Sequence, residues 1–260
     1  MPFDSCDGLK RYTFPLLDDQ PVLHGIFTRQ GGVSPAPLAS LNLGGYLGDP
    51  RDNQIENRRR IFAACDRPVE TIYDAWQVHG THVICVEQPR PLETEHVKGD
   101  AILTDRPGVT LFMRFADCVP VMLYDPARRV VGLVHAGWRG TVERIAGVAV
   151  GRMVEEYGSR PQDILACVGP SICADHYQVG PEVAAAVQTS FGAHSAELLA
   201  QRNGSVHLDL WTANRLALEE CGVRAVQVSG LCTACNTGDW YSHRAENGQT
   251  GRFGALIAIR

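Results

Sequence analysis

The chain has 260 residues, of which 45% are hydrophobic and 20% charged, with a formal net charge of −5 and a pI near 6.0. This is the composition of a soluble globular protein, and it excludes a nucleic-acid binder driven by phosphate neutralisation, because such proteins carry a basic excess. The short basic run NRRR at Asn57–Arg60 predicts the solvated face of a helix for Arg59 and Arg60. We therefore expect no nucleic-acid partner.

Membrane and export signals are not visible in the sequence. No apolar run reaches the length of a membrane span, and the N-terminus MPFDSCDGLK lacks the basic start and apolar run of a signal peptide. Nine cysteines, an odd number, suit reduced thiols better than a disulfide framework. We expect a cytoplasmic protein without a membrane partner, and we assign structural roles to Cys6, Cys65, Cys85, Cys167 and Cys221.

The predicted elements mix short strands with helices. Apolar runs predict strands over residues 22–28 and 131–136, and helical spacing predicts helices over 53–65, 141–158, 180–192 and 210–222. The helix over 141–158 is expected to begin at a cap formed by Gly140 and Thr141, and the last helix to begin near Asp209 and end at Gly222. Strands grouped as hairpins predict an α+β fold, and the absence of linkers or repeats predicts one domain over 1–260.

Three motifs carry side chains of the kind that bind metals. They are WQVHGTHV with His79 and His82, FADCVPV with Cys118, and VHAGWRG with His135. A set of two histidines and one cysteine would leave one position of a tetrahedral zinc ion open, as catalytic zinc requires. Cys118 lies 39 positions after His79 and 17 before His135, which matches no local zinc-binding pattern. The residues alone therefore leave open whether Cys118 and His135 are ligands or core residues.

These motifs occur in the same order as in a known family. WQVHGTHV, FADCVPV, GLVHAGWRG, VGPSICADHYQVGPEV, HLDLWTANRLAL and LCTACNTGDWYSHRAENGQTGRFGALI, with HGIFTRQGGVSPAPLASLNLGG near the start, cover almost the whole chain. In these stretches the chain resembles the bacterial proteins long catalogued as laccase-like multicopper polyphenol oxidases and now understood as purine nucleoside phosphorylases, a family also linked to peptidoglycan editing.

The resemblance implies a fold, an activity and a set of ligands. The fold implied is a layered α-β-β-α sandwich with mixed sheets, similar to the catalytic domain of cytotoxic necrotizing factor. The ligands and catalytic residues implied are His79, Cys118 and His135, around zinc rather than copper. The activities implied are phosphorolysis of adenosine, guanosine, inosine and methylthioadenosine, and deamination of adenosine; an editing role on peptidoglycan precursors is proposed for some members.

Phosphorolysis needs cations or backbone amides that hold phosphate against the ribose. Arg29 in TRQGG, Arg58 in ENRR and Arg244 in SHRAE are candidates, and Arg29 is preferred because glycines beside it let the backbone approach a ligand. Asn42 in SLNLGG could bond ribose or phosphate, or form a turn. The resemblance also places His243 and Arg244 at the mouth of the site.

Deamination would need a proton shuttle near the metal. The chain lacks the HxE and PCxxC signature of zinc nucleobase deaminases, and Asp100 and Asp117 are the carboxylates nearest the motifs. On an extended strand Asp117 would point away from Cys118, so we expect it to support the site rather than transfer protons.

Cys232 and Cys235 have CxxC spacing, but a second zinc would need another such pair nearby and a thioredoxin-like site would need a helix start, and neither is evident. The family resemblance instead implies that CTACN lies around the mouth of the site.

Three other functions compete. A copper oxidase needs several histidine-rich sites, and nine scattered histidines do not supply them. A cysteine hydrolase, compatible with peptidoglycan-precursor editing, would use Cys118 as nucleophile and His135 as base. A binding module would use His82 as a fourth ligand, but on an extended strand it would face away from His79. The sequence favours a zinc-dependent purine nucleoside phosphorylase, a monomer or small homo-oligomer, whose preferred nucleoside stays open.

Overall fold

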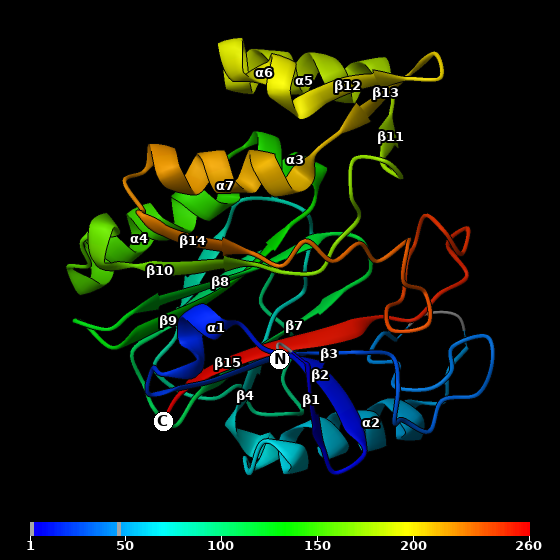
Figure 1. Ribbon diagram of the computed structural model, residues 1–260. Coiled ribbons are helices and arrows are strands. Elements are labelled where there is room, and N and C mark those ends of the chain that lie inside the picture. Colours follow the sequence, from blue (N-terminus) through cyan, green and yellow to red (C-terminus); the bar gives the residue numbers. More distant parts are fainter. Residues whose placement is uncertain (1–2, 46–47) are drawn as a thin grey trace.

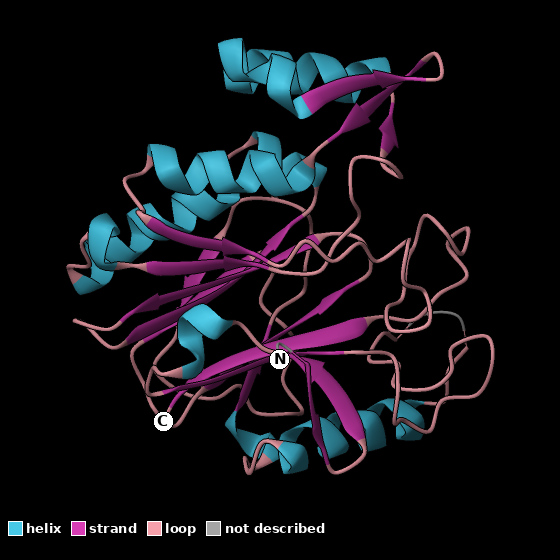
Figure 2. Cartoon of the chain, viewed as in Figure 1, coloured by secondary structure: helices cyan, strands magenta, loops and turns pink. Residues whose placement is uncertain are grey.

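The computed structural model describes residues 3–45 and 48–260, and it arranges them in four layers (Figure 1). Two six-stranded sheets lie face to face, with one helix layer outside each sheet (Figure 2). Helix α2 (Arg51–Ala64) covers the first sheet, and α4 (Ile145–Tyr157) and α7 (Leu210–Glu220) cover the second. The predicted α+β class and the layered sandwich are confirmed.

The first sheet has the strand order β1-β2-β3-β15-β7-β4. Its strands are β1 (Phe3–Cys6), β2 (Leu9–Tyr12), β3 (Val22–Phe27), β15 (Phe253–Ile259), β7 (Thr110–Phe115) and β4 (Ile72–Asp74). The pairs are antiparallel except for β4 with β7. The strand predicted over 22–28 is confirmed as β3.

The second sheet has the order β14-β10-β8-β9-β6-β5. Its strands are β14 (Ala225–Val228), β10 (Leu165–Val168), β8 (Val119–Asp125), β9 (Val130–Ala136), β6 (Ala101–Thr104) and β5 (Val83–Cys85). Both β8 and β9 are buried over their whole length, because one face meets the helices and the other meets the first sheet. The strand predicted over 131–136 is confirmed as β9.

Side chains of β8 alternate between two cores, as the two-residue period of a strand requires. Val119, Val121 and Leu123 pack toward the helix layer with residues of α4 and α7. Met122 and Tyr124 point the other way and pack between the sheets with residues of β7 and β15. A third core joins α2 to the outer face of the first sheet. The two sheets and their helices are therefore linked through shared strands.

The remaining elements are short. A small sheet of β11 (Gln178–Val179), β13 (Ser205–Leu208) and β12 (Leu199–Arg202) lies with α5 (Pro181–Phe191) and α6 (Ser195–Leu198) at one end of the molecule (Figure 1). The others are α1 (Pro15–Asp18), α3 (Trp138–Val142) and the 3-10 turns Val69–Thr71, Pro161–Asp163 and Gly192–His194. None of the helices in the described residues is long and apolar enough to cross a bilayer.

The helix predictions hold with one correction. Helices α2, α5 and α7 occupy the predicted segments, and Asp209 caps α7 by accepting the N–H groups of Trp211 and Thr212. The single helix expected over 141–158 with a cap at Gly140 and Thr141 is wrong. Helix α3 already begins at Trp138, and Arg144 adopts a left-handed backbone with φ 62°, which ends α3 and starts α4.

The basic run on α2 matches its prediction. The Arg59 side chain is 71% exposed and lies 3.7 Å from Glu56, and Arg60 pairs with the same carboxylate at 2.9 Å. Both arginines lie on the solvent face of α2, as the sequence indicates.

Candidate metal centre

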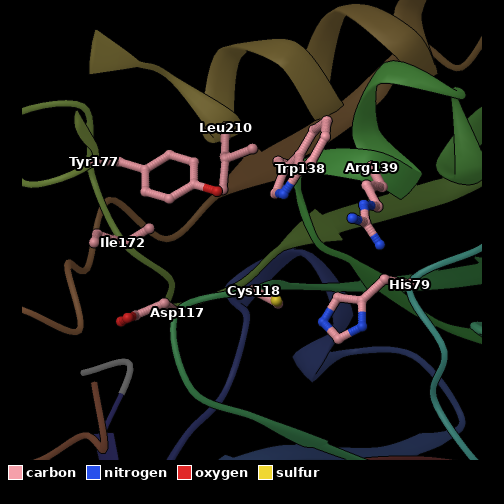
Figure 3. Close-up of a pocket in the computed structure, with 8 residues that line it drawn as sticks. All are labelled: His79, Asp117, Cys118, Trp138, Arg139, Ile172, Tyr177 and Leu210. Carbon is pink, nitrogen blue, oxygen red and sulfur yellow. The ribbon is translucent and has the colours of Figure 1, made fainter. Parts of the chain in front are cut away.

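Three side chains from separate segments meet at one end of the second sheet. His79 lies in the bend between β4 and β5, Cys118 directly precedes β8, and His135 lies near the end of β9. One ligand atom from each of the three lies within 4.8 Å of the other two. The antiparallel register of β8 and β9 pairs Pro120 with His135, which fixes Cys118 beside the imidazole. Figure 3 shows the His79 ring and the Cys118 sulfur facing the same space.

Left-handed backbone conformations at His79 and Asp117 orient the segments that carry His79 and Cys118. His79 has φ 62° and Asp117 has φ 80°, and a non-glycine residue rarely adopts such values without a constraint. His79 and His82 therefore do not lie on one extended strand, and that expectation is wrong. His82 is not part of the metal-binding group among the described residues.

Asp100 orients the site, a role that the sequence did not reveal. Its Oδ1 accepts a hydrogen bond from His135 Nδ1 at 2.8 Å and from the backbone N–H of His79 at 2.9 Å. Its Oδ2 accepts from the backbone N–H of Gly80 at 2.8 Å. Burial would raise the pKa of the Asp100 carboxyl, but these donors lower it, so the group is a carboxylate. The bond to Nδ1 leaves His135 Nε2 as the atom that can bind a metal.

The charges of the site favour a thiolate. Burial would raise the pKa of Cys118, but His135 and His79 overcome this effect and lower it. Burial would lower the pKa of His135, but Cys118 and Asp100 raise it. Both directions favour a thiolate beside an imidazolium when no metal is bound, and a metal ion that displaces the proton would meet one thiolate and two imidazoles.

The donor set and the space around it fit zinc. One thiolate and two imidazoles are ligands that zinc prefers, and three protein ligands leave a fourth position for water or substrate. Gly137, the N-cap of α3, leaves room, because a Cβ there would lie 2.9 Å from His79 Cδ2 and 3.2 Å from Cys118 Sγ. Copper shares these ligand preferences, so the donor set indicates a metal without fixing its identity.

Two adjoining cavities open onto this group, the larger onto His79, Cys118 and His135 and the smaller onto His79 and Cys118. The larger has a volume of about 620 Å³ and the smaller about 250 Å³, and they share His79, Asp117, Cys118 and Tyr177. The smaller, drawn in Figure 3, is also lined by Trp138, Arg139, Ile172 and Leu210. The larger adds Gly44, Gly45, Trp76, Gln77, Arg114, Ala116, His135, His243, Arg244 and Arg252. This volume suits a small organic ligand.

Of the predicted substrate residues, His243 and Arg244 line the larger cavity. The backbone N–H of Arg244 donates to Asp117 Oδ2 at 2.7 Å, and its guanidinium donates to the Gln178 carbonyl at 2.9 Å. The same guanidinium lies 5.1 Å from the centre of the Tyr177 ring. Arg244 is therefore held at the cavity with its charge beside an aromatic wall.

The preferred anion candidate, Arg29, lies outside the lining of both cavities. Its guanidinium donates to the carbonyls of Ala39 and Thr237 and to Glu246 Oε1, the last at 2.9 Å. It also lies 4.3 Å from the centre of the Tyr241 ring. These contacts hold two loops together, and the anion contact expected of Arg29 stays a prediction.

Asn42 and Arg58 are likewise absent from the lining of the cavities. Asn42 is fully buried, and its Oδ1 accepts the backbone N–H groups of Gly44 and Arg252, which fits the turn-forming alternative. Burial lowers the pKa of Arg58, and the charge of Arg114 lowers it further. Arg58 therefore adds positive potential near a cavity-lining arginine.

Asp117 links the loops around the cavity. Its Oδ1 accepts the Thr233 hydroxyl at 2.6 Å, and its Oδ2 accepts the Arg244 backbone N–H. The supporting role predicted for Asp117 agrees with these contacts, although the cause is a left-handed backbone and not an extended strand. Sequence reasoning missed Arg114 and Arg252, since isolated arginines carry no motif.

One expectation about the second cysteine pair is wrong. A partner pair for Cys232 and Cys235 was not evident in the sequence, but the structure places Cys173 and His176 beside them. The C-x-x-H spacing in SICADHY was the available signal.

Comparison with known proteins identifies the family. Residues 23–260 match the family described as multi-copper polyphenol oxidoreductase laccase. A Deinococcus radiodurans protein named purine nucleoside phosphorylase is 44% identical over 92% of this chain and 89% of its own. The protein named purine nucleoside phosphorylase YlmD from Bacillus subtilis is 37% identical over 94% of this chain and 90% of its own.

Solved structures agree with this assignment. The crystal structure of YlmD from Geobacillus stearothermophilus has a TM-score of 0.92 and 34% identity, and the match covers 100% of this chain and 99% of that one. That of a Bacillus licheniformis protein titled YfiH also has a TM-score of 0.92, at 31% identity over 100% of this chain and 99% of its own. The chain therefore belongs to the laccase-like family of multi-copper polyphenol oxidoreductases, with relatives that are named purine nucleoside phosphorylases.

Proposed function

We propose that this protein is a zinc-dependent purine nucleoside phosphorylase that accepts adenosine, inosine, guanosine and methylthioadenosine and deaminates adenosine as a side activity. One observation carries the proposal: the three-ligand metal site opens into a cavity lined by Arg114, Arg244 and Arg252. Phosphorolysis requires a site that holds phosphate against the ribose, and arginines beside the metal-binding group can supply it. The names of the relatives support the same reaction.

The arginines supply the anion site. Arg114 is held by Gln77, whose Oε1 accepts the Arg114 backbone N–H at 3.1 Å, and by the Ala75 carbonyl, which accepts from Nη2 at 3.3 Å. Arg252 donates from Nη1 to the Gly251 carbonyl at 2.8 Å. Guanidinium groups bind phosphate oxygens in paired hydrogen bonds, and fixed ones lose little freedom when the anion binds.

Aromatic side chains supply a surface for the purine. Tyr177 lines both cavities, and Trp76, whose exposure is 51%, lines the larger one. Flat aromatic rings stack on any base without reading its hydrogen-bonding groups. This arrangement explains a broad tolerance for adenine and hypoxanthine nucleosides.

The reaction then divides among groups on the chain. A phosphate oxygen held by the arginines forms a bond to the anomeric carbon while the bond from that carbon to the purine nitrogen breaks, and the purine takes up a proton. His243, exposed at the cavity, can donate a hydrogen bond to the departing base. When bound, zinc would polarise an oxygen atom of the substrate or of water.

A base-release assay tests the proposal. Purified protein of known zinc content is given adenosine and inosine with and without phosphate, and the assay is repeated after chelation. We expect base and ribose 1-phosphate only when phosphate and metal are both present. Release without phosphate, or with the metal removed, would contradict a metal-dependent phosphorylase.

Arg114 provides a sharper test. Arg114→Ala removes a charge-assisted contact worth about 1.5–3 kcal/mol, so the KM for phosphate should rise roughly tenfold to a hundredfold. The KM for nucleoside should change less, because the base lies against the aromatic wall. Arg152→Ala is the matched control, since Arg152 lies on α4 and pairs with Glu156 at 2.8 Å. An unchanged phosphate KM in Arg114→Ala would remove that residue from the anion site.

A cysteine hydrolase is the second candidate, and the Cys118–His135 pair favours it. A thiolate beside an imidazolium is also the arrangement of a thiol hydrolase, which could edit peptidoglycan precursors. Such an enzyme would keep its activity after chelation and lose it on alkylation of Cys118. The phosphorylase would lose activity in both treatments, so chelation separates the two.

Copper chemistry is tested by metal analysis. An oxidase would bind copper in stoichiometric amounts and show the intense absorption of a copper thiolate. We expect neither in protein purified with the metal that it acquires during expression, because metal availability, and not the higher intrinsic affinity of such sites for Cu²⁺, decides which metal is bound.

We further propose that residues 1–260 form one catalytic domain in the cytoplasm, as a monomer or small homo-oligomer. All nine cysteines are free thiols, which suits a reducing compartment. The shared cores between the layers support a single domain.

A further inference from the structure

Three cysteines and one histidine form a second cluster of metal-binding groups outside the site described above. Sγ of Cys173 and Sγ of Cys235 each lie 3.5 Å from Nδ1 of His176, and Sγ of Cys232 lies 3.8 Å from the same atom. In a tetrahedral zinc site, bonds of 2.3 Å to sulfur and 2.0–2.1 Å to nitrogen separate the ligand atoms by about 3.5 Å. The four side chains are therefore spaced as one ion would hold them.

Two turns with the same ligand spacing supply the four side chains. Cys173-x-x-His176 closes a turn in which the His176 N–H donates to the Cys173 carbonyl at 3.1 Å. Cys232-x-x-Cys235 forms the second turn, where Asn236 Nδ2 donates to the Cys232 carbonyl at 2.9 Å. Structural zinc sites commonly have two such turns, each of which carries two ligands separated by two residues. In this chain Cys232 lies 56 positions after His176.

The fold brings the two turns together. They follow β10 and β14, which are parallel neighbours, so both chains leave the sheet at the same edge. Beyond the strands, a further bridge pairs Ser171 with Cys232, with the Thr233 N–H donating to the Ser171 carbonyl at 3.1 Å. The Cys173 N–H also donates to Cys232 Sγ at 3.3 Å, a contact that stabilises a thiolate. The positions of the four side chains are thus fixed by strand pairing in the sheet and by the bridge beyond it.

We propose that Cys173, His176, Cys232 and Cys235 bind a structural zinc ion. Four protein ligands fill the tetrahedron and leave no position for water or substrate, which distinguishes this site from the three-ligand centre. Cys173 and Cys232 are buried, and Cys235 and His176 are exposed, so an ion can enter from the solvent side. The proposal concerns zinc binding alone and does not rest on the proposed enzymatic activity.

The position of the proposed ion indicates its structural role beside the first site. Ile172 and Tyr177, which line the cavity at the first site, flank the turn that carries Cys173 and His176. Thr233, inside the second turn, donates to Asp117, the residue before Cys118. A zinc ion that ties the two turns together would hold this wall of the cavity in place without touching a substrate.

Zinc counting tests the proposal. Purified wild-type protein should contain two zinc ions per chain by mass spectrometry of the metal, and His79→Ala should keep one. Cys235→Ser, which changes an exposed ligand, should also keep one, and the combined variant should keep none. Cys221→Ser is the matched control, because Cys221 is an exposed cysteine outside both clusters, and it should keep two.

Cobalt provides a second readout that does not depend on zinc content. Protein loaded with cobalt should show strong thiolate-to-metal absorption from the site with three sulfurs, and Cys235→Ser should lose most of it while Cys221→Ser keeps it. The proposal is overturned if His79→Ala binds no zinc, or if Cys235→Ser leaves both the zinc count and the cobalt spectrum unchanged. It is also overturned if intact mass shows a disulfide among the three cysteines in protein kept reduced.

Discussion

Nδ1 of His135 and Oδ1 of Asp100 lie 2.8 Å apart. His135 belongs to β9, and Asp100 directly precedes β6, the neighbouring strand of the same sheet. The same carboxylate accepts backbone N–H groups from His79 and Gly80. One buried carboxylate therefore fixes the ring of one proposed ligand and the backbone of another. The proposed metal centre would therefore depend on a residue outside the three-residue group.

Asp100→Asn should weaken zinc binding at the three-ligand site about 10–100-fold, the usual effect of losing a partner of a metal-binding histidine. The amide can still accept hydrogen bonds, but it carries no charge to support the imidazole. A competition titration with a chelating dye measures the change. Asp163→Asn, which alters a surface carboxylate paired with Arg160, is the control and should bind zinc as the wild type does.

Gly137→Ala should also reduce zinc affinity, by about tenfold or more. The backbone of Gly137 has φ −73°, which alanine adopts freely, so the effect comes from the methyl group that would meet His79 Cδ2 at 2.9 Å. Gly151→Ala on α4 is the control, because a Cβ there meets nothing within 4 Å. Equal affinities in the two variants would show that the ligands can move aside without cost.

Stability should fall in mild acid because of His24. Burial lowers the pKa of His24 from 6.5 to about 4, and its Nε2 accepts the backbone N–H of Phe14 at 2.8 Å, so the buried ring is neutral. Asp18 lies 3.7 Å from the same nitrogen but is half exposed. The unfolded chain binds a proton near pH 6.5 and the folded chain does not, so the free energy of unfolding drops as the pH falls from 6.5 to about 4.

His24→Gln isolates this effect, because the amide oxygen can accept the Phe14 N–H and does not titrate. Urea unfolding at about pH 7 and about pH 4.5 should show a loss in the wild type that exceeds the loss in the variant by about 2 kcal/mol. Equal losses in the two proteins would show that other groups cause the acid sensitivity.

Leu133→Ala should destabilise the whole chain in one step. Leu133 is fully buried on β9, between the two sheets, and its truncation should cost about 2–5 kcal/mol. Because this core joins both sheets, a single domain predicts one unfolding transition, shifted as a unit, when fluorescence and circular dichroism are compared. Two separate transitions, with only one of them shifted, would divide the chain into two domains.

The sequence predicted the elements well where local patterns decide. Asp209 and Gly222 mark the ends of α7 because capping is a local effect, and the apolar run of β9 reflects burial on both faces. The break at Arg144 was missed because a left-handed arginine is imposed by packing and leaves no trace in composition.

In the candidate site, too, local motifs were visible in the sequence and contacts between distant segments were not. Motifs pointed to His79, Cys118 and His135, but only the pairing of β8 with β9 shows that Cys118 and His135 meet. Asp100, Arg114 and Arg252 could not be found from the sequence, because their roles depend on contacts between distant segments. The contacts of Arg29 with Glu246 and Tyr241 were hidden for the same reason, since its glycine-rich neighbourhood did not reveal them.

The pairing of β8 with β9 also makes the metal-binding group dependent on the tertiary structure. Cys118 and His135 become neighbours only after this ladder has formed in its register, and the Asp100 carboxylate arrives with β6, the next strand of the sheet. A metal ion bound by these residues would therefore not start folding, as it does in a zinc finger, because its binding site forms only when the sheet has formed. The identity of a metal bound there would then be decided after folding, by the metals available to the folded chain.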